Sequence, residues 1–130
     1  MRFLMDTHAF AWAVGEPSRL PRRVREMLQD RESVPFVSCA SVWEMSIKCK
    51  AGRWPEVLPF MDERLYAQFL DQLRAVELPV NSRHARVAGQ FELDHKDPFD
   101  RLIAAQAFLE GLPLVSKDSA MDEFPVSRIW

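Results

Sequence analysis

HKDPFDRLIAAQAFLEGLPLVSKD, residues 95–118, is the stretch that decides the fold class of this chain. Asp97 followed by Pro98 is typical of a helix start, with the acid as the cap and proline as the first helical residue. Gly111 ends the predicted helix, and a short apolar strand over residues 114–116 follows almost at once. A helix that leads directly into a short, continuously apolar strand indicates an α/β fold with a parallel sheet.

The same alternation of strand and helix extends along the rest of the chain. Further strands are predicted at residues 3–5, 35–38, 76–78 and 126–129. Further helices are predicted at residues 8–14, 21–31, 41–51, 59–73 and 82–90. Short apolar strands between helices predict a parallel sheet that is covered on both faces. We therefore expect an α/β fold, a three-layer α/β/α sandwich with a central five-stranded parallel sheet.

Length and composition indicate one soluble domain over residues 1–130. The chain is 48% hydrophobic and 28% charged, as in ordinary globular proteins, and its net charge is −2. No apolar run approaches the roughly 20 residues that a membrane helix needs, and the N-terminus does not resemble a signal peptide. Cys39 and Cys49 match no metal or disulfide pattern. These features predict a cytoplasmic protein with reduced cysteines, and the charge argues against coating of nucleic acid by bulk electrostatics.

Four acidic residues stand where an α/β chain brings distant segments together. Asp6 and Asp118 follow predicted strands, whereas Glu44 and Asp100 fall in the first turn of predicted helices. In parallel sheets, ligands bind at the carboxyl ends of the strands, so these acids are expected on one rim. Gathered carboxylates repel one another unless a cation is bound, and oxygen ligands suit Mg²⁺ or Mn²⁺, ions that handle phosphates. The pattern indicates nuclease chemistry.

Each acid also has a purely structural interpretation. Asp6 is placed equally well to cap a helix or to bind a metal. Glu44 matches a capping box with Ser41, and Asp118 fits a turn. Asp100 shares its helix face with small core residues, where an acid is hard to explain by stability, so a functional role is favoured there.

Other polar and aromatic residues are interpreted more simply. Asp97 is expected mainly as a helix cap, and Thr7 as a cap or a group that supports a ligand. The three histidines show no spacing typical of zinc, and His84 is expected on an exposed helix side. Two basic clusters, one over residues 19–25 and one over residues 48–53, are interpreted as solvated helix faces. The four tryptophans are expected in the core or in an interface: Trp12, Trp43, Trp54 and Trp130.

Two phosphate-handling classes fit the sequence poorly. A phosphate-responsive receiver domain needs a pair of acids after its first strand and an aspartate at the end of its third. Here Asp6 stands alone, and the third strand carries Glu77. A haloacid-dehalogenase-type phosphatase needs a second aspartate two residues after the first, but that position is His8.

Taken together, the motifs resemble those of the PIN-domain family, specifically the VapC-like toxins of bacterial type II toxin–antitoxin pairs. The matching fragments are FLMDTH at residues 3–8, SVWE at 41–44 with Ile47-Lys48, DPFDRLIAAQA at 97–107 and LVSKD at 114–118. The resemblance extends over essentially the whole chain. It implies a five-stranded parallel sheet between helices and a Mg²⁺- or Mn²⁺-dependent ribonuclease site at its rim.

The resemblance also implies residue roles and partners. The catalytic, metal-binding acids fall on Asp6, Glu44, Asp100 and Asp118, and the accessory positions are Asp97, Thr7 and Ser116. Family toxins cut structured RNA such as tRNA or rRNA, which implies products with 5′-phosphate and 3′-hydroxyl ends. They form dimers and are inhibited by an antitoxin whose tail enters the active-site groove. The alternative is a non-catalytic PIN-like binding module whose acidic groove holds a basic partner tail.

Overall fold

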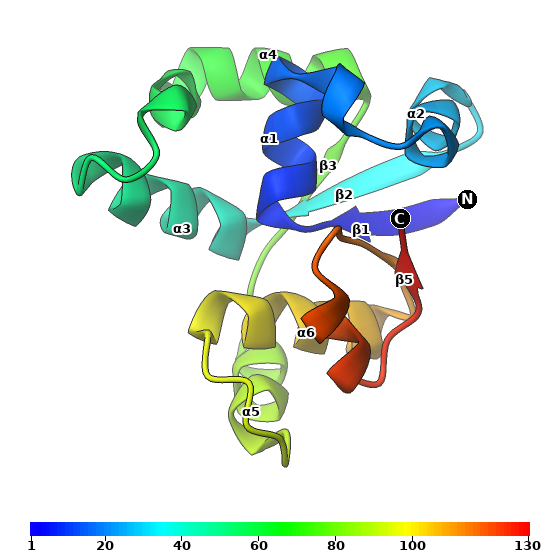
Figure 1. The fold of residues 1–130 in the computed structure, drawn as a ribbon, viewed down its shortest axis with the longest axis vertical. Helices are drawn as coiled ribbons and strands as arrows, with labels where there is room; N and C mark the ends of the chain where they lie inside the picture. Colours follow the sequence, from blue (N-terminus) through cyan, green and yellow to red (C-terminus); the bar gives the residue numbers. More distant parts are fainter.

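The structure is a computed structural model that describes residues 1–130, and its centre is a five-stranded parallel sheet (Figure 1). The order across the sheet is β3-β2-β1-β4-β5. The strands are β1 (Arg2–Met5), β2 (Val34–Ser38), β3 (Val76–Leu78), β4 (Leu114–Val115) and β5 (Arg128–Ile129). All five predicted strands are present, although β4 and β5 are shorter than expected.

Helices cover both faces of the sheet. The α-helices are α1 (Thr7–Gly15), α2 (Arg22–Gln29), α3 (Cys39–Lys50), α4 (Glu63–Leu73), α5 (Ser82–Gln90) and α6 (Pro98–Glu110). There are three 3₁₀ helices: η1 (Pro17–Arg19) between α1 and α2, η2 (Pro55–Met61) between α3 and α4, and η3 (Ser119–Glu123) between β4 and β5. Figure 1 shows α1, α2 and α4 on one side of the sheet and α5 and α6 on the other. The expected three-layer α/β/α sandwich is confirmed, and no helix is long and apolar enough to span a membrane.

The alternation of side chains along β1 divides the core into two halves. Phe3 and Met5 belong to the cluster that contains Phe10 of α1, whereas Leu4 belongs to the cluster that contains Ile103 and Ala104 of α6. Successive side chains of a strand point to opposite faces, so a strand with helices on both sides must be apolar throughout. This is why residues 3–5 of β1 and both residues of β4 form apolar runs in the sequence.

The order of the strands places several chain segments at one edge of the sheet. β1 lies at the centre and pairs in parallel with both β2 and β4. The chain moves outward from β1 to β2 on one side and returns to β4 on the other, so the switch point lies beside β1. Figure 1 shows the end of β1, the start of α3 and the start of α6 on the same side of the molecule.

Two predicted helix starts are wrong. Ser38, rather than Ser41, caps α3, and its Oγ accepts a hydrogen bond from the Ala40 N–H at 3.0 Å. Glu44 therefore lies in the second turn of α3, and the expected capping box between Ser41 and Glu44 does not form. Pro21 is the cap residue of α2 and not its first helical residue. The α3 helix begins earlier than the local pattern suggests, directly after Ser38, and α2 begins one residue later than expected, directly after Pro21.

Two further expectations are corrected by the tertiary structure. The helix expected over residues 59–73 is divided into η2 and α4, because Asp62 caps a new helix through its bond from the Leu65 N–H. His84 is buried rather than exposed. Its Nδ1 accepts from the Asn81 N–H, and its Nε2 lies 2.9 Å from Glu110 Oε1. A local pattern cannot show that this histidine packs between α5 and α6.

Candidate active site

The four predicted acids line one pocket at the carboxyl edge of the sheet. The pocket has a volume of about 180 Å³, and none of its eight lining residues is hydrophobic. They are Asp6, Thr7, His8, Glu44, Lys48, Asp97, Asp100 and Asp118. Folding thus brings together acids that lie up to 112 positions apart, from Asp6 to Asp118. Five of the eight residues are carboxylates, so the pocket is an oxygen-rich, acidic site.

Asp6 caps α1 and also faces the pocket. Its Oδ1 accepts a hydrogen bond from the Ala9 N–H at 2.8 Å, which confirms the helix-cap interpretation of this residue. Burial raises the pKa of Asp6 to about 6, although hydrogen bonds from Ser116 and Ala9 oppose the shift. The charges of Asp100 and Glu44 raise it further. Asp6 is therefore held at a position where its negative charge is unfavourable without a cation.

Glu44 reaches the pocket because α3 packs closely against α1. The buried Thr7 hydroxyl donates to Ser41 Oγ at 3.0 Å and joins the two helices. Ser41 and Glu44 lie one turn apart on α3. The Thr7–Ser41 contact therefore also fixes the position of Glu44 relative to α1, the helix that Asp6 caps. The Glu44 side chain is only 5% exposed, and its Oε2 lies 2.5 Å from Lys48 Nζ.

Asp97 and Asp100 share the first turn of α6. Asp97 Oδ1 accepts from the N–H groups of Phe99 at 2.9 Å and Asp100 at 3.1 Å, which confirms it as the helix cap. Asp100 Oδ2 lies 2.8 Å from Nε2 of His95. Burial raises the pKa of Asp100, and the bond to His95 opposes this. The cap thus fixes the turn that presents Asp100 to the pocket.

Asp118 and Ser116 complete the edge after β4. Asp118 Oδ1 accepts from the Ala120 N–H at 2.9 Å and caps η3, so this acid also has a structural role. The Asp118 N–H donates to Ser116 Oγ at 3.1 Å. Ser116 is fully buried behind the pocket and also bonds Asp6. It therefore links two of the acids without lining the pocket itself.

Three residues of the site were not predicted from the sequence: His8, Lys48 and His95. Lys48 follows Glu44 by four residues, a spacing that places both on one helix face, so the sequence did contain a signal for this pair. His8 lines the pocket from α1, and burial lowers its pKa. His95 lies in the loop before α6, where no periodic pattern predicts the direction of a side chain.

The donor set fits a hard divalent cation, although the side chains are directed elsewhere in this structure. No three His, Cys, Asp or Glu side chains converge closely enough to hold an ion. The carboxylates instead contact internal partners: helix-cap N–H groups for Asp6, Asp97 and Asp118, Lys48 for Glu44 and His95 for Asp100. All five are oxygen donors, as Mg²⁺ and Mn²⁺ prefer. Their mutual repulsion, which raises the pKa of Asp6, is the interaction that a bound cation would relieve.

Comparison with known proteins identifies the family of this fold. A family model described as "PIN domain" matches residues 3–126. Among solved structures, VapBC2 from Rickettsia felis, bound to a DNA fragment from its promoter, has a TM-score of 0.69 at 15% identity, covering 99% of this chain and 98% of that chain. DNA-bound VapBC from Salmonella typhimurium has a TM-score of 0.68 at 21% identity, covering 99% and 97%. FitAcB from Neisseria gonorrhoeae has a TM-score of 0.61 at 19% identity, covering 100% and 97%.

No curated protein sequence matches the chain. The solved structures share its fold at low sequence identity, whereas the family model matches nearly its whole length. The matched segment extends from β1 to the residues just before β5 and includes all five acids of the pocket. The chain belongs to the PIN domain family.

Proposed function

We propose that this protein is a divalent-metal-dependent endoribonuclease and the toxin of a type II toxin–antitoxin pair. PIN domains are generally nucleases, which makes a hydrolase acting on phosphodiester bonds the broad class. One observation carries the proposal to this chain: Asp6, Glu44, Asp100 and Asp118 meet in one small pocket that has no hydrophobic lining. Structured RNA such as tRNA or rRNA is the proposed substrate, with 5′-phosphate and 3′-hydroxyl products.

The same four acids are proposed to hold Mg²⁺ or Mn²⁺. A bound ion would lower the pKa of a water molecule that it coordinates, and it would stabilise negative charge on a phosphate. The chain itself sets the positions of the acids through the Asp97 cap, the Thr7–Ser41 bond and the buried Ser116. Asp97, Thr7 and Ser116 are therefore proposed as accessory residues that orient the ligands.

Lys48 and His95 are the internal partners that a cation would have to replace. Lys48 Nζ already places positive charge beside Glu44, and its position at the mouth of an acidic pocket suits contact with an RNA phosphate. His95 Nε2 lies 2.8 Å from Asp100 Oδ2. No side chain in the pocket needs to act as a general base for the proposed reaction.

The proposed partners are a second copy of the chain and a cognate antitoxin whose tail enters the acidic groove. The solved VapBC and FitAB assemblies that share this fold support this proposal, and FitAB was solved bound to an IR36 DNA fragment. A tail with basic residues would complement the five carboxylates of the pocket. The same complementarity supports the alternative function, a non-catalytic module that only binds such a tail.

An RNA cleavage assay separates the two functions. Purified protein is incubated with tRNA and rRNA in Mg²⁺, in Mn²⁺ and in EDTA, and the 5′ ends of the products are sequenced. We expect specific cleavage that requires the divalent ion and that Asp100→Asn abolishes without loss of folding. The matched control is Asp71→Asn on α4, because Asp71 is an exposed acid outside the pocket. Equal cleavage by Asp100→Asn and wild type would refute the ribonuclease, and metal-independent binding of a basic peptide without any cleavage would support the binding module.

A further inference from the structure

We propose that the groove between α1 and η2 is a subsite that stacks one unpaired nucleobase of the RNA beside the acidic pocket. This inference rests on the proposed ribonuclease function and adds a site of nucleotide selection to it. The residues that would form the stacking surfaces are Trp12 of α1 and Trp54, which precedes η2.

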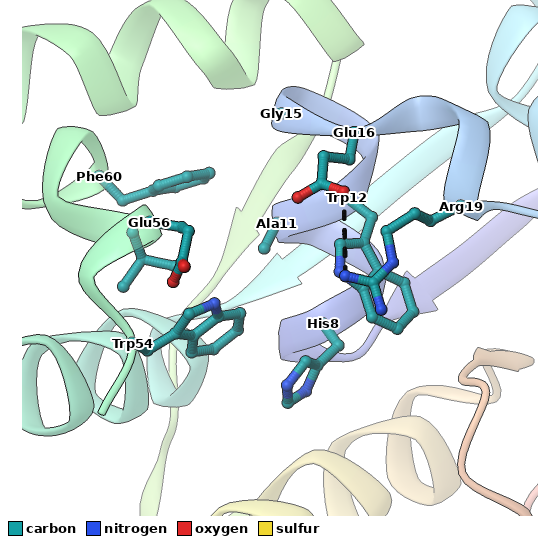
Figure 2. Close-up of a pocket in the computed structure, with 10 residues that line it drawn as sticks. His8, Ala11, Trp12, Gly15, Glu16, Arg19, Trp54, Glu56 and Phe60 are labelled. Carbon is teal, nitrogen blue, oxygen red and sulfur yellow. Dashed lines mark ion pairs between the residues drawn. The ribbon is translucent and has the colours of Figure 1, made fainter. Parts of the chain in front are cut away.

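The groove is a cavity of about 570 Å³, larger than the acidic pocket. Figure 2 shows the indole rings of Trp12 and Trp54 on two sides of it, with the imidazole of His8 between them at one end. The apolar part of the wall is formed by Phe60, Ala11 and Val57. The carboxyl groups of Glu16 and Glu56 provide hydrogen-bond acceptors. The site thus combines flat aromatic surfaces with a few polar groups, as small-ligand sites do.

The groove and the acidic pocket are neighbours that share one lining residue. His8 lines both, because it lies on the first turn of α1 directly after Asp6 and Thr7. A further hollow, lined by Asp6, His8, Trp12, Lys117, Asp118 and Ser119, contains the carboxylates and the indole together. A nucleotide whose phosphate lies at the acids would therefore have its neighbouring base within reach of Trp12.

Flat side chains already stack on both tryptophans. The His8 ring lies on Trp54 with ring centroids 4.4 Å apart and an interplanar angle of 20°. The Arg19 guanidinium lies over Trp12 at 4.3 Å from the ring centroid. These contacts show that planar groups fit against the indoles, and a nucleobase is a planar group of the same kind. Single-stranded RNA is read in this way, by bases stacked on aromatic rings or on arginine.

The charges around the groove favour RNA over a basic peptide. Lys48 Nζ and Lys117 Nζ each lie 5.9 Å from a tryptophan ring centroid, Trp54 for the first and Trp12 for the second. Together with Arg19, which pairs with Glu16 at 3.9 Å, they place positive charge beside the aromatic surfaces, and this charge attracts phosphates. Glu56 remains to accept hydrogen bonds from the amino groups of a base.

The test measures binding of short RNA by protein that cannot cleave it. The probes are fluorescein-labelled hexanucleotides of A, C or U, each with and without one abasic nucleotide, and Kd is measured by fluorescence anisotropy. All variants carry Asp100→Asn. Trp54→Leu and Trp12→Leu each remove one stacking surface but keep apolar volume, whereas Trp54→Phe keeps an aromatic ring. Trp43→Leu is the matched control, because Trp43 is 56% exposed on α3 and lines neither cavity.

We expect Trp54→Leu and Trp12→Leu to raise Kd about 5- to 100-fold, the usual effect of losing a stacked base. Trp54→Phe should retain most of the affinity, and Trp43→Leu should match the parent. The abasic nucleotide should weaken binding by the parent more than binding by Trp54→Leu, since the variant has already lost the Trp54 part of the stacking contact. Circular dichroism and thermal melting identify any variant that fails to fold, and the abasic probes then test the subsite on the intact protein.

The outcomes for the subsite and for the ribonuclease are distinguishable. If Kd changes less than twofold in both leucine variants and at every abasic position, the base subsite is refuted, whether or not wild-type protein cleaves RNA. If binding depends on the tryptophans but wild-type protein with Mg²⁺ leaves all RNA intact, the base subsite is supported and the proposed ribonuclease activity is refuted. A lysine- and arginine-rich peptide whose affinity depends on Trp54, while RNA binding does not, would assign the groove to a protein tail and overturn the inference.

Discussion

His95 Nε2 lies 2.8 Å from Asp100 Oδ2, so a loop residue holds a pocket acid in place. The other ring nitrogen, Nδ1, lies 3.8 Å from Glu123 Oε2 at the end of η3. The imidazole thereby connects the start of α6 to the segment that follows Asp118. The backbone of His95 is held as well, because its carbonyl accepts from Arg101 at 2.8 Å.

Removal of this imidazole should move the pH dependence of cleavage. Burial raises the pKa of Asp100 and His95 lowers it, so His95→Ala leaves the effect of burial unopposed and raises that pKa further. If the ionised carboxylate is the active form, the acid limb of the pH–rate profile moves to higher pH. Profiles of cleavage at saturating Mg²⁺ from about pH 4, near the ordinary aspartate pKa, upward to neutral pH measure this. His95→Gln, which keeps an N–H donor, should shift the limb less, and an identical acid limb in His95→Ala would contradict the prediction.

Asp6→Asn should stabilise the metal-free protein at neutral pH. The folded state raises the pKa of Asp6 from 3.8 to about 6, so the unfolded chain releases this proton first as pH rises. The wild-type free energy of unfolding therefore falls between pH 3.8 and about 6. Asparagine keeps the oxygen that accepts from Ala9 but carries no charge, and the expected gain at pH 7 is on the order of 2 kcal/mol.

Urea denaturation in EDTA at pH 7 and at pH 4 checks this prediction. The difference in unfolding free energy between Asp6→Asn and wild type should be large at pH 7 and small at pH 4. Added Mg²⁺ should stabilise the wild type more than the variant, because a ligand that binds only the folded state adds to its stability. A variant that is less stable than wild type at pH 7 in EDTA would show that the Asp6 charge is already compensated inside the fold.

Lys48→Met should destabilise the metal-free protein and make it more dependent on the cation. Glu44 is 5% exposed on its side chain, and the change leaves its charge without the Lys48 partner. Loss of one partner of a buried ion pair lowers the free energy of unfolding by about 3 kcal/mol. The loss is smaller where water reaches the site, as it does at Lys48. Mn²⁺ should restore more stability to Lys48→Met than to wild type, as measured by thermal melting with and without the ion. Lys50→Met is the control, since Lys50 is exposed in the last turn of the same helix; equal losses in both variants would contradict a specific pair.

Arg101→Lys should loosen the loop before α6. The Arg101 guanidinium donates to the carbonyls of Ala88, Phe91, Leu93 and His95 at 2.7 to 3.2 Å. A lysine ammonium group cannot donate to all four carbonyls at once, because it lacks the planar, forked donor group of arginine. We therefore expect a loss of about 2 kcal/mol in unfolding free energy. Hydrogen exchange should show reduced protection around residues 91–97. Arg23→Lys, at an exposed position of α2, should leave both measurements unchanged.

Much of the fold was predictable because its signals are local. Apolar runs marked β1 and β4 at the centre of the sheet, since strands buried on both faces cannot carry polar side chains. Asp97, Pro98 and Gly111 marked the ends of α6, since caps and a left-handed terminal residue depend only on near neighbours. The capping box at Ser41 failed for the opposite reason: Ser38, at the end of β2, starts the helix three residues earlier, and Ser41 bonds Thr7 of another helix.

The sequence by itself determined the alternation of strands and helices, the two-sided core and the boundary positions of Asp6, Asp100 and Asp118. These features follow from backbone geometry and burial over a few residues. Only the tertiary structure decided that His95 holds Asp100, that Lys48 lies at the pocket, that His84 is buried, and that Trp12 and Trp54 share a groove with His8. Apart from the Glu44–Lys48 pair within α3, these contacts join residues from different parts of the chain. The direction of a side chain across such a gap depends on the packing of the whole fold, which no short stretch of sequence encodes.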